Sequence, residues 1–335
     1  MARRGSPGAL AVSVSTPGLV SLFGHDPATY GPHAVHAPER NYPETNCYTD
    51  IIIELLHARG DEPLAALGST VRVDFEGDQF TFFKPELHDI ELLFGIDIHE
   101  MQPYRSLPDQ IAELITTDRT LIVELDAWYL PDTRASSYRT AHVKTSVVAE
   151  AIDQSGELFR YFHNTTLNEL AGEDFRGVFR VEDGWSADIL PPYTEIVRFD
   201  AGPRLDGPEL RDAALGILRH HLDRIRPGNP FERFAQRLEA DLPGLLEGDA
   251  AAYHDYAFAT VRMAGAGFEL CAAHIDWLLG PEGASASAAL GRIVDGSKIL
   301  NFRLARRRPF EPAPVIGELA DAWDEALTTL DRIVP

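Results

Sequence analysis

Cys47 is the residue of this sequence whose type and setting best suit chemistry. It follows the polar residues 41–46 and opens the segment 47–59, which is apolar on most sides, a pattern that predicts a helix opening at the cysteine. Free backbone N–H groups at a helix N-terminus favour the nucleophilic thiolate form of a cysteine. The sequence therefore predicts a nucleophile at Cys47; the alternative is a small, buried residue without a chemical role.

A thiolate nucleophile needs a base, and His142 is predicted to serve Cys47 in this way. His142 opens the β-branched run 142–152, so we expect it at the edge of a sheet, facing the start of the helix. The order Cys, His, Asn on helix, strand and next strand suggests Asn164 as the group that orients the imidazole. Asp153 is the alternative, although its turn lies at the far end of the hairpin.

Two asparagines precede the helix and could help to stabilise an oxyanion. The unpaired N–H groups of the helix start could receive the developing charge, with Asn41 and Asn46 as side-chain donors.

The elements that must position these groups form an α+β unit. A helix is expected over 47–59, with Thr45 or Asn46 as N-cap and Gly60 as C-cap. A hairpin and two further helices follow, and then a run of short antiparallel strands. The predicted hairpin covers 71–84, the helices 86–94 and 106–115, and the strands 120–126, 142–152, 157–162, 178–181 and 195–200.

Helical periodicity dominates the chain from residue 206 onward, and Pro or Gly marks each break. The sequence thus predicts three parts: an irregular N-terminal arm (1–40, with a short strand near 10–15), a catalytic domain (41–203) and an all-helical domain (204–335). The expected helices cover 209–226, 230–246, 250–279, 285–304 and 316–333.

The net charge of −22 argues against nucleic acid or an anionic membrane as partner. An acidic partner would need a local basic patch, and the sequence offers two candidates, although either could be a solvated helix face. The first is Arg303, Arg306, Arg307 and Arg308; the second is Arg219, His220, His221, Arg224 and Arg226. No apolar run is long enough to cross a bilayer, and a cytoplasmic location is expected over export.

Metal and cofactor motifs are weak in this sequence. His33 and His36 lie three apart in the irregular arm without a third ligand nearby in sequence, so no metal is expected. Phosphate-loop, dinucleotide and serine-nucleophile motifs are absent, and no cofactor is expected. Cys271 lies in a strongly apolar helix and is expected to be structural.

Several short motifs carry a family resemblance. Residues 41–170 resemble a papain-like family that includes the aminoacyl-carrier-protein acyltransferase of the butirosin pathway, and the whole chain resembles domain-of-unknown-function family 1839. The motifs are Asn46-Cys47, residues 125–131 (LDAWYLP), Tyr138 followed by Ala141-His142, residues 161–164 (YFHN), residues 268–271 (FELC) and residues 302–306 (FRLAR).

This resemblance implies a papain-like fold for the catalytic domain and an acyltransferase activity. Cys47 would take an aminoacyl group from a carrier protein, where a phosphopantetheine arm presents it, and pass it to a small-molecule amine or another nucleophile. The carrier is expected to dock on the patch from Arg303 to Arg308. Relatives commonly use aspartate where this chain has Asn164, which departs from their pattern.

The expected substrate would be recognised where strand 120–126 leaves the sheet. Asp126 and Tyr129 are candidates to hold the ammonium group of the substrate. The alternative is a structural role, in which Asp126 caps a turn and Tyr129 packs beside it. Tyr138 is a candidate to close over the thiolate.

Two alternatives to acyl transfer remain at this stage. The same residues could hydrolyse an amide or thioester, since water and amine compete for one acyl-enzyme. Transfer is favoured because the helical domain could shield the site from water. The third possibility is a non-catalytic scaffold that binds a carrier protein.

Overall fold

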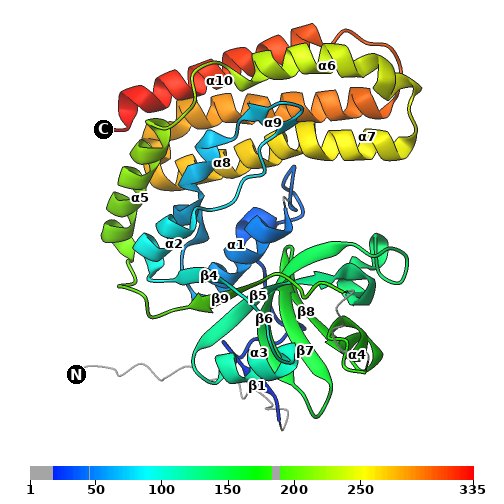
Figure 1. The fold of residues 1–335 in the computed structure, drawn as a ribbon. Coiled ribbons are helices and arrows are strands. Elements are labelled where there is room, and N and C mark those ends of the chain that lie inside the picture. The colour runs from blue at the N-terminus through cyan, green and yellow to red at the C-terminus, as the bar shows by residue number, and fades with distance from the viewer. Residues whose placement is uncertain (1–17, 45, 183–188) are drawn as a thin grey trace, which may run out of the picture.

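The computed structural model describes residues 18–44, 46–182 and 189–335 of the chain. Figure 1 shows the sheet with its covering helices at one end of the molecule and the long helices α6 to α10 at the other. Within the described residues, no helix combines the length and the apolar character needed to cross a membrane.

A seven-stranded sheet, antiparallel at every pairing, forms the first part. Its strand order is β4-β9-β5-β6-β7-β8, and β1 pairs with the part of β6 that β5 leaves uncovered. The strands are β1 (Val20–Ser21), β4 (Asp97–Met101), β5 (Arg119–Asp126), β6 (Lys144–Asp153), β7 (Leu158–His163), β8 (Thr166–Ala171) and β9 (Thr194–Arg198).

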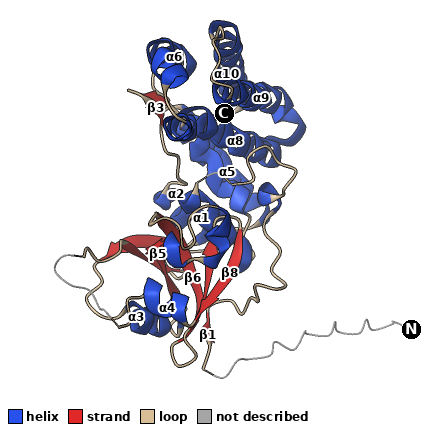
Figure 2. Ribbon diagram, turned by 90° about the vertical axis from the view of Figure 1, so that its right-hand side faces the viewer, coloured by secondary structure: helices blue, strands red, loops and turns tan. Residues whose placement is uncertain are grey.

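Helices cover both faces of this sheet, as Figure 2 shows for α1 above it and α3 and α4 below it. The helices α1 (Cys47–Arg59) and α2 (Leu87–Phe94) share a core with one face, which contributes Ile122, Val148 and Phe162. The helices α3 (Leu107–Ile115) and α4 (Glu173–Val178) share a second core with Val123 and Val147 of the other face. Side chains alternate between faces along a strand, so these two cores define which face each polar residue of the sheet occupies.

The helical part closely follows the predicted pattern. It contains α5 (Gly207–Leu222), α6 (Pro230–Glu247), α7 (Ala250–Ala257), α8 (Met263–Leu279), α9 (Ala284–Ala305) and α10 (Ala313–Ile333). The helix expected over 250–279 is continuous in direction but has a π-helical turn at Phe258–Arg262 between α7 and α8.

Most of the segment after α1 packs into the core of the helical part, although Ala65 and Ala66 belong to the core that α1 shares with the sheet. A 3₁₀ helix (Pro63–Arg72) and the hairpin β2 (Phe75–Glu76) and β3 (Gln79–Phe80) contribute Leu67, Val71, Phe75 and Phe80 to the core of the long helices. The predicted hairpin is therefore present, but it is shorter than expected, and Val71 belongs to the 3₁₀ helix. A hydrophobic core thus crosses the predicted domain boundary at residue 204.

One predicted strand is wrong, and the sheet contains strands beyond those predicted. The strand expected over 178–181 is wrong, because α4 occupies Glu173–Val178 and directs Phe175 and Val178, three residues apart, into the core under the sheet. The strands β4 and β8 were not predicted. The short strand expected near 10–15, and Thr45 as N-cap, lie outside the described residues.

Candidate functional site

Cys47 is the first residue of α1, as predicted. Asn46 is its N-cap, with an extended backbone (φ −144°, ψ 146°) and a side-chain oxygen that accepts from the Thr49 N–H at 2.9 Å. Cys47 is half-buried, whereas Cys271 is fully buried and burial raises the pKa of its thiol to about 12. Of the two cysteines, Cys47 is the one that a substrate can reach.

The direction of α1 fixes the end of the sheet at which Cys47 lies. The Tyr48 hydroxyl donates to Glu195 near the start of β9 at 2.7 Å, and the Arg59 guanidinium lies 5.2 Å from the ring centroid of Phe199, just beyond its end. The helix therefore runs in the direction of β9 and opposite to β5, which pairs antiparallel with β9. Cys47 lies at the end where β5 finishes and β6 begins.

A histidine–aspartate pair occupies this same end of the sheet. The Nδ1 atom of His142 lies 2.6 Å from Oδ2 of Asp126, and the imidazole stacks on Trp128 with ring centroids 4.6 Å apart and planes 10° apart. The other carboxylate oxygen, Oδ1, accepts from the Trp128 N–H at 3.0 Å. With Nδ1–H donating to the carboxylate, Nε2 carries the lone pair that could accept a proton.

The pair also lies on the face of the sheet that carries α1. Ile122 packs in the core beside α1, and Asp126 follows it by four residues on the same strand, hence on the same face. His142 itself lies two residues before β6 rather than on its first residue, so the loop sets its direction. Its side chain is 68% exposed, and the site is therefore open to solvent.

The side chain in contact with His142 is not the one predicted to orient it. The acceptor for His142 is Asp126 on the preceding strand, while Asn164 lies in the turn between β7 and β8 with φ of 48°. The alternative Asp153 lies at the far end of β6, where its carboxylate accepts from the Ser155 hydroxyl and the Gly156 N–H, each at 2.8 Å. Neither alternative shares in the contact to His142.

Both asparagines predicted to stabilise an oxyanion have structural partners. The Asn46 amide donates to the Phe83 carbonyl at 3.1 Å while its oxygen caps α1, and the residue is buried. The side-chain oxygen of Asn41 accepts from the Lys298 ammonium of α9 at 2.5 Å. The backbone N–H groups at the start of α1 remain the donors best placed for this role.

The three residues predicted to bind substrate lie near His142, and each has a contact within the protein. Both oxygens of Asp126 already have partners, the Trp128 N–H and Nδ1 of His142. Tyr129 packs closely on Gly177 of α4, where it leaves no room for a β-carbon. The Tyr138 hydroxyl donates to Asp174 of α4 at 3.0 Å.

A cavity of about 560 Å³ opens beside His142. Its wall comes from the ends of β5 and β6, from α4 and from the segment before β9; it includes Tyr129, Val143, Val178, Leu190 and Tyr193. Val143 and Leu190 are 48% and 87% exposed, so the rim is partly apolar, although the exposed Lys144 also lines it. All of the lining residues lie between 124 and 193, which means that the helical part does not cover it.

A buried hydrogen-bond cluster on the other face of the sheet was not predicted. Both ring nitrogens of His163 form hydrogen bonds: Nδ1 with Asp132, and Nε2 with the Thr145 hydroxyl at 2.8 Å. The Tyr161 hydroxyl also donates to Asp132, at 2.5 Å. Asp132 belongs to the 3₁₀ turn Pro131–Ala135 that follows Trp128. The cluster therefore anchors the loop whose Trp128 stacks on His142.

The N-terminal histidines form an ionic cluster. His36 is buried, with Nδ1 at 2.5 Å from Glu54 and Nε2 at 3.4 Å from Asp50. Burial alone would lower the pKa of His36, but hydrogen bonds to Asp50 and Glu54 and their charges raise it to about 9. The described residues contain no group of three or more side chains arranged to hold a metal ion.

Fold and site together define a mixed α+β protein in which a helix-opening cysteine and a His–Asp pair share one end of an antiparallel sheet. The chain belongs to the DUF1839 family: the model of the DUF1839 N-terminal domain matches residues 31–199 and that of the DUF1839 C-terminal domain matches residues 207–332. A search of curated proteins gives no match.

Proposed function

We propose that this protein is a cysteine-dependent acyltransferase with a papain-like catalytic domain, which moves an aminoacyl group from a carrier-protein thioester to an amine. The observation that carries the proposal is the hydrogen-bonded pair of His142 and Asp126 at the sheet end where α1 begins with Cys47. A nucleophile, a base and an acceptor that orients the base are the parts that acyl transfer requires.

The steps follow from these roles. Nε2 of His142 takes the proton of the Cys47 thiol, and the sulfur attacks the thioester carbonyl to form a tetrahedral intermediate. Backbone N–H groups of the first turn of α1 receive the oxyanion, and its collapse expels the carrier thiolate, which takes the proton back from His142. An amine then attacks the acyl-enzyme, loses a proton to His142 and releases Cys47.

The arginine patch supports an acidic carrier protein as donor. Among the described residues, Arg303, Arg306 and Arg308 form no ion pair, so their charges are available to an acidic partner. The Arg306 guanidinium lies 5.1 Å from the ring centroid of Phe302, which is 61% exposed. Lys298, earlier on α9, contacts Asn41 on the segment that leads to Cys47.

The second predicted patch is a weaker docking site. Arg219 pairs with Asp223 and Asp331, and Arg226 pairs with Glu76. His221 is fully buried and contacts Asp89 at 2.7 Å. Most charges of this second patch are therefore neutralised by carboxylates of the same chain. We propose that the carrier docks on the first patch.

Hydrolysis is a second candidate for a specific reason. The His142 side chain is 68% exposed, and the cavity beside it has walls from the sheet part alone, so water can reach the proposed base. The helical part, which was expected to shield the site, does not line this cavity.

Intact-protein mass spectrometry after incubation with aminoacylated carrier tests the proposal. We expect an adduct of one aminoacyl mass on the wild-type chain and none on Cys47→Ala, with Cys271→Ala as the matched control that retains it. Decay of the adduct in buffer alone at the rate seen with added amines would assign hydrolysis. A wild-type chain that gains no adduct while still binding the carrier would refute both activities and favour a scaffold.

A further inference from the structure

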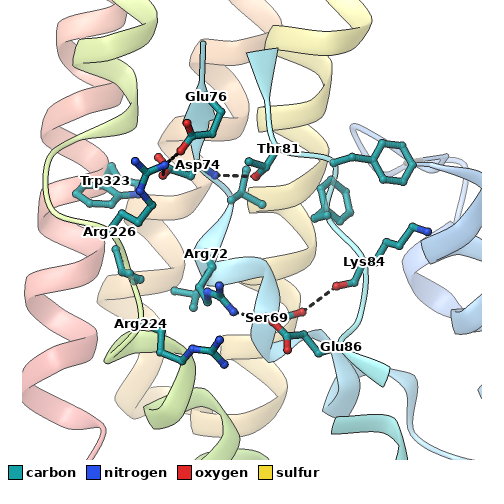
Figure 3. Close-up of a pocket in the computed structure, with 15 residues that line it drawn as sticks. Ser69, Arg72, Asp74, Glu76, Thr81, Lys84, Glu86, Arg224, Arg226 and Trp323 are labelled. Carbon is teal, nitrogen blue, oxygen red and sulfur yellow. Dashed lines mark hydrogen bonds and ion pairs between the residues drawn. The ribbon is translucent and has the colours of Figure 1, made fainter. Parts of the chain in front are cut away.

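A second cavity, of about 240 Å³, lies between the hairpin β2–β3 and the helical part (Figure 3). Its walls are the end of the 3₁₀ helix, the hairpin β2–β3, the connecting segment 81–86, the connection from α5 to α6, and Trp323 of α10. None of the residues assigned to the proposed catalytic site lines it.

The carboxylates in its wall already have cationic partners. Glu86 pairs with Arg72 at 2.6 Å, and Glu76 pairs with Arg226. The carboxylate of Asp74 pairs with Arg233, a residue outside the lining. The cavity therefore presents no carboxylate that lacks a guanidinium.

Hydrogen-bond donors, in contrast, are left over. Arg224 has no carboxylate partner among the described residues, and its guanidinium contacts only the imidazole of His220 at 3.0 Å. The indole N–H of Trp323, in a residue that is 8% exposed, is buried and has no hydrogen-bond partner in the described part of the chain. A buried donor without an acceptor costs about 1–3 kcal/mol, so a ligand that supplies an acceptor is favoured there.

The guanidiniums of Arg72 and Arg224 point into the same lower part of the cavity in Figure 3, whereas the side chain of Lys84 points away. The Lys84 ammonium lies 3.8 Å from the ring centroid of Tyr48. Asp74 Oδ2 is the one buried acceptor in the wall without a hydrogen bond, and it lies 3.8 Å from Arg226. The donors that a ligand would meet are thus mainly guanidinium and indole groups.

We propose that this cavity binds a small molecule through a phosphate group. A guanidinium group can donate two parallel hydrogen bonds to the oxygens of a phosphate, and the indole N–H adds an uncharged donor. The volume is below the range of about 300–1,000 Å³ usual for drug-sized ligands, which suits a phosphate with a small body.

The ligand would also contact the segment that fastens the first turn of α1. The Phe83 carbonyl accepts from Asn46 Nδ2 at 3.1 Å and from the Thr49 hydroxyl at 3.0 Å, and Phe83 is part of the cavity wall. Two sources could supply the phosphate: a free phosphorylated metabolite, or a phosphopantetheine arm, the latter resting on the proposed function.

Isothermal titration of the full chain with inorganic phosphate, phosphopantetheine, pantetheine and acetate tests the proposal. We expect saturable binding of phosphate and phosphopantetheine, and binding about tenfold weaker in each of Arg224→Gln and Trp323→Phe. Arg292→Gln is the matched control, because Arg292 is half-exposed and pairs with Glu325 away from the cavity. It should bind as the wild type does.

The probes separate the two sources. Phosphopantetheine that binds tighter than inorganic phosphate assigns the arm, and equal binding assigns a free metabolite; either supports the site. Acetate or pantetheine that binds as tightly as the phosphate-bearing probes would overturn phosphate recognition. Wild-type affinity in both variants, with their folding verified by circular dichroism, would overturn the site. The same titration with Cys47→Ala should be unchanged, so its result is independent of the acyl-transfer proposal.

Discussion

Replacement of Asp126 by asparagine isolates the contact that orients His142. The asparagine side chain has nearly the shape of aspartate, and its amide oxygen can still accept from the Trp128 N–H. If the asparagine oxygen keeps the contact with the Trp128 N–H, its NH₂ group takes the place of Oδ2 and faces Nδ1 of His142. That arrangement favours the imidazole tautomer with the proton on Nε2, which cannot take a proton from a thiol.

The size of the effect follows from the exposure of the pair. A hydrogen bond to a charged group contributes about 1.5–3 kcal/mol when it is well formed. The His142 and Asp126 side chains are 68% and 35% exposed, so solvent weakens the contact and the lower end applies. At 1.36 kcal/mol for each tenfold change in rate, the Asp126→Asn variant should react about tenfold more slowly.

The rate of Cys47 alkylation by iodoacetamide near neutral pH, followed by intact mass, measures this effect without knowledge of the substrate. Asp200→Asn is the matched control, since Asp200 pairs with Arg119 beyond the far end of β9. Asn164→Ala should also keep the wild-type rate. A slow Asn164→Ala variant beside an unaffected Asp126→Asn variant would refute the assignment of Asp126 and restore the asparagine.

Three further outcomes are expected. The native chain should alkylate at one thiol, and Cys271 should label only in denaturant, because burial raises its pKa to about 12; rapid native labelling at two sites by intact mass would contradict this. His163→Ala should lower the free energy of unfolding by about 2–4 kcal/mol in urea titrations, because it leaves the Asp132 carboxylate without its imidazole partner, and an unchanged midpoint would remove the cluster as an anchor. The folded-state pKa of His36 is raised from 6.5 to about 9, so its contribution to stability is complete below pH 6.5 and is lost as the pH rises to about 9. Over that window the free energy of unfolding of the wild type, measured by urea titration, should fall by on the order of 3 kcal/mol more than that of His36→Gln. An equal fall in both proteins would contradict this.

Helices with strong periodicity were predictable from this sequence, and irregular elements were not. The long helices α6, α9 and α10 lie within a few residues of their predicted bounds, because each buries one continuous face. The strand β4 combines two buried residues with the polar pair His99 and Glu100, so alternation does not mark it. The sequence of the 3₁₀ helix Pro63–Arg72 cannot be distinguished from that of a loop, because tertiary packing rather than a local pattern determines its conformation.

The helix-opening cysteine was the predictable part of the candidate site. Polar residues before Cys47 and apolar residues after it specify a helix start whatever the rest of the fold does. The partners of His142 depend instead on which strands meet at one end of the sheet and where each strand stops. Sequence order alone gives neither quantity.

Strand register explains why the histidine pairs with the preceding strand. In β5 and β6, Asp126 pairs with Lys144, which is two residues from His142. In β6 and β7, Phe162 pairs with Val148, so the continued register brings Asn164 level with Ser146, four residues from His142. Four residues of strand span about 13 Å, beyond the reach of one asparagine side chain.

A signal for the correct partner was nonetheless present in the sequence. Asp126 ends an apolar strand and is followed two residues later by Trp128, an arrangement typical of a carboxylate that caps a turn. A capping carboxylate has its second oxygen free at the sheet end, and a flat aromatic ring beside it offers a surface on which an imidazole can stack. Acidic residues that end the strand before a candidate base should therefore be weighed equally with polar residues that end the strand after it.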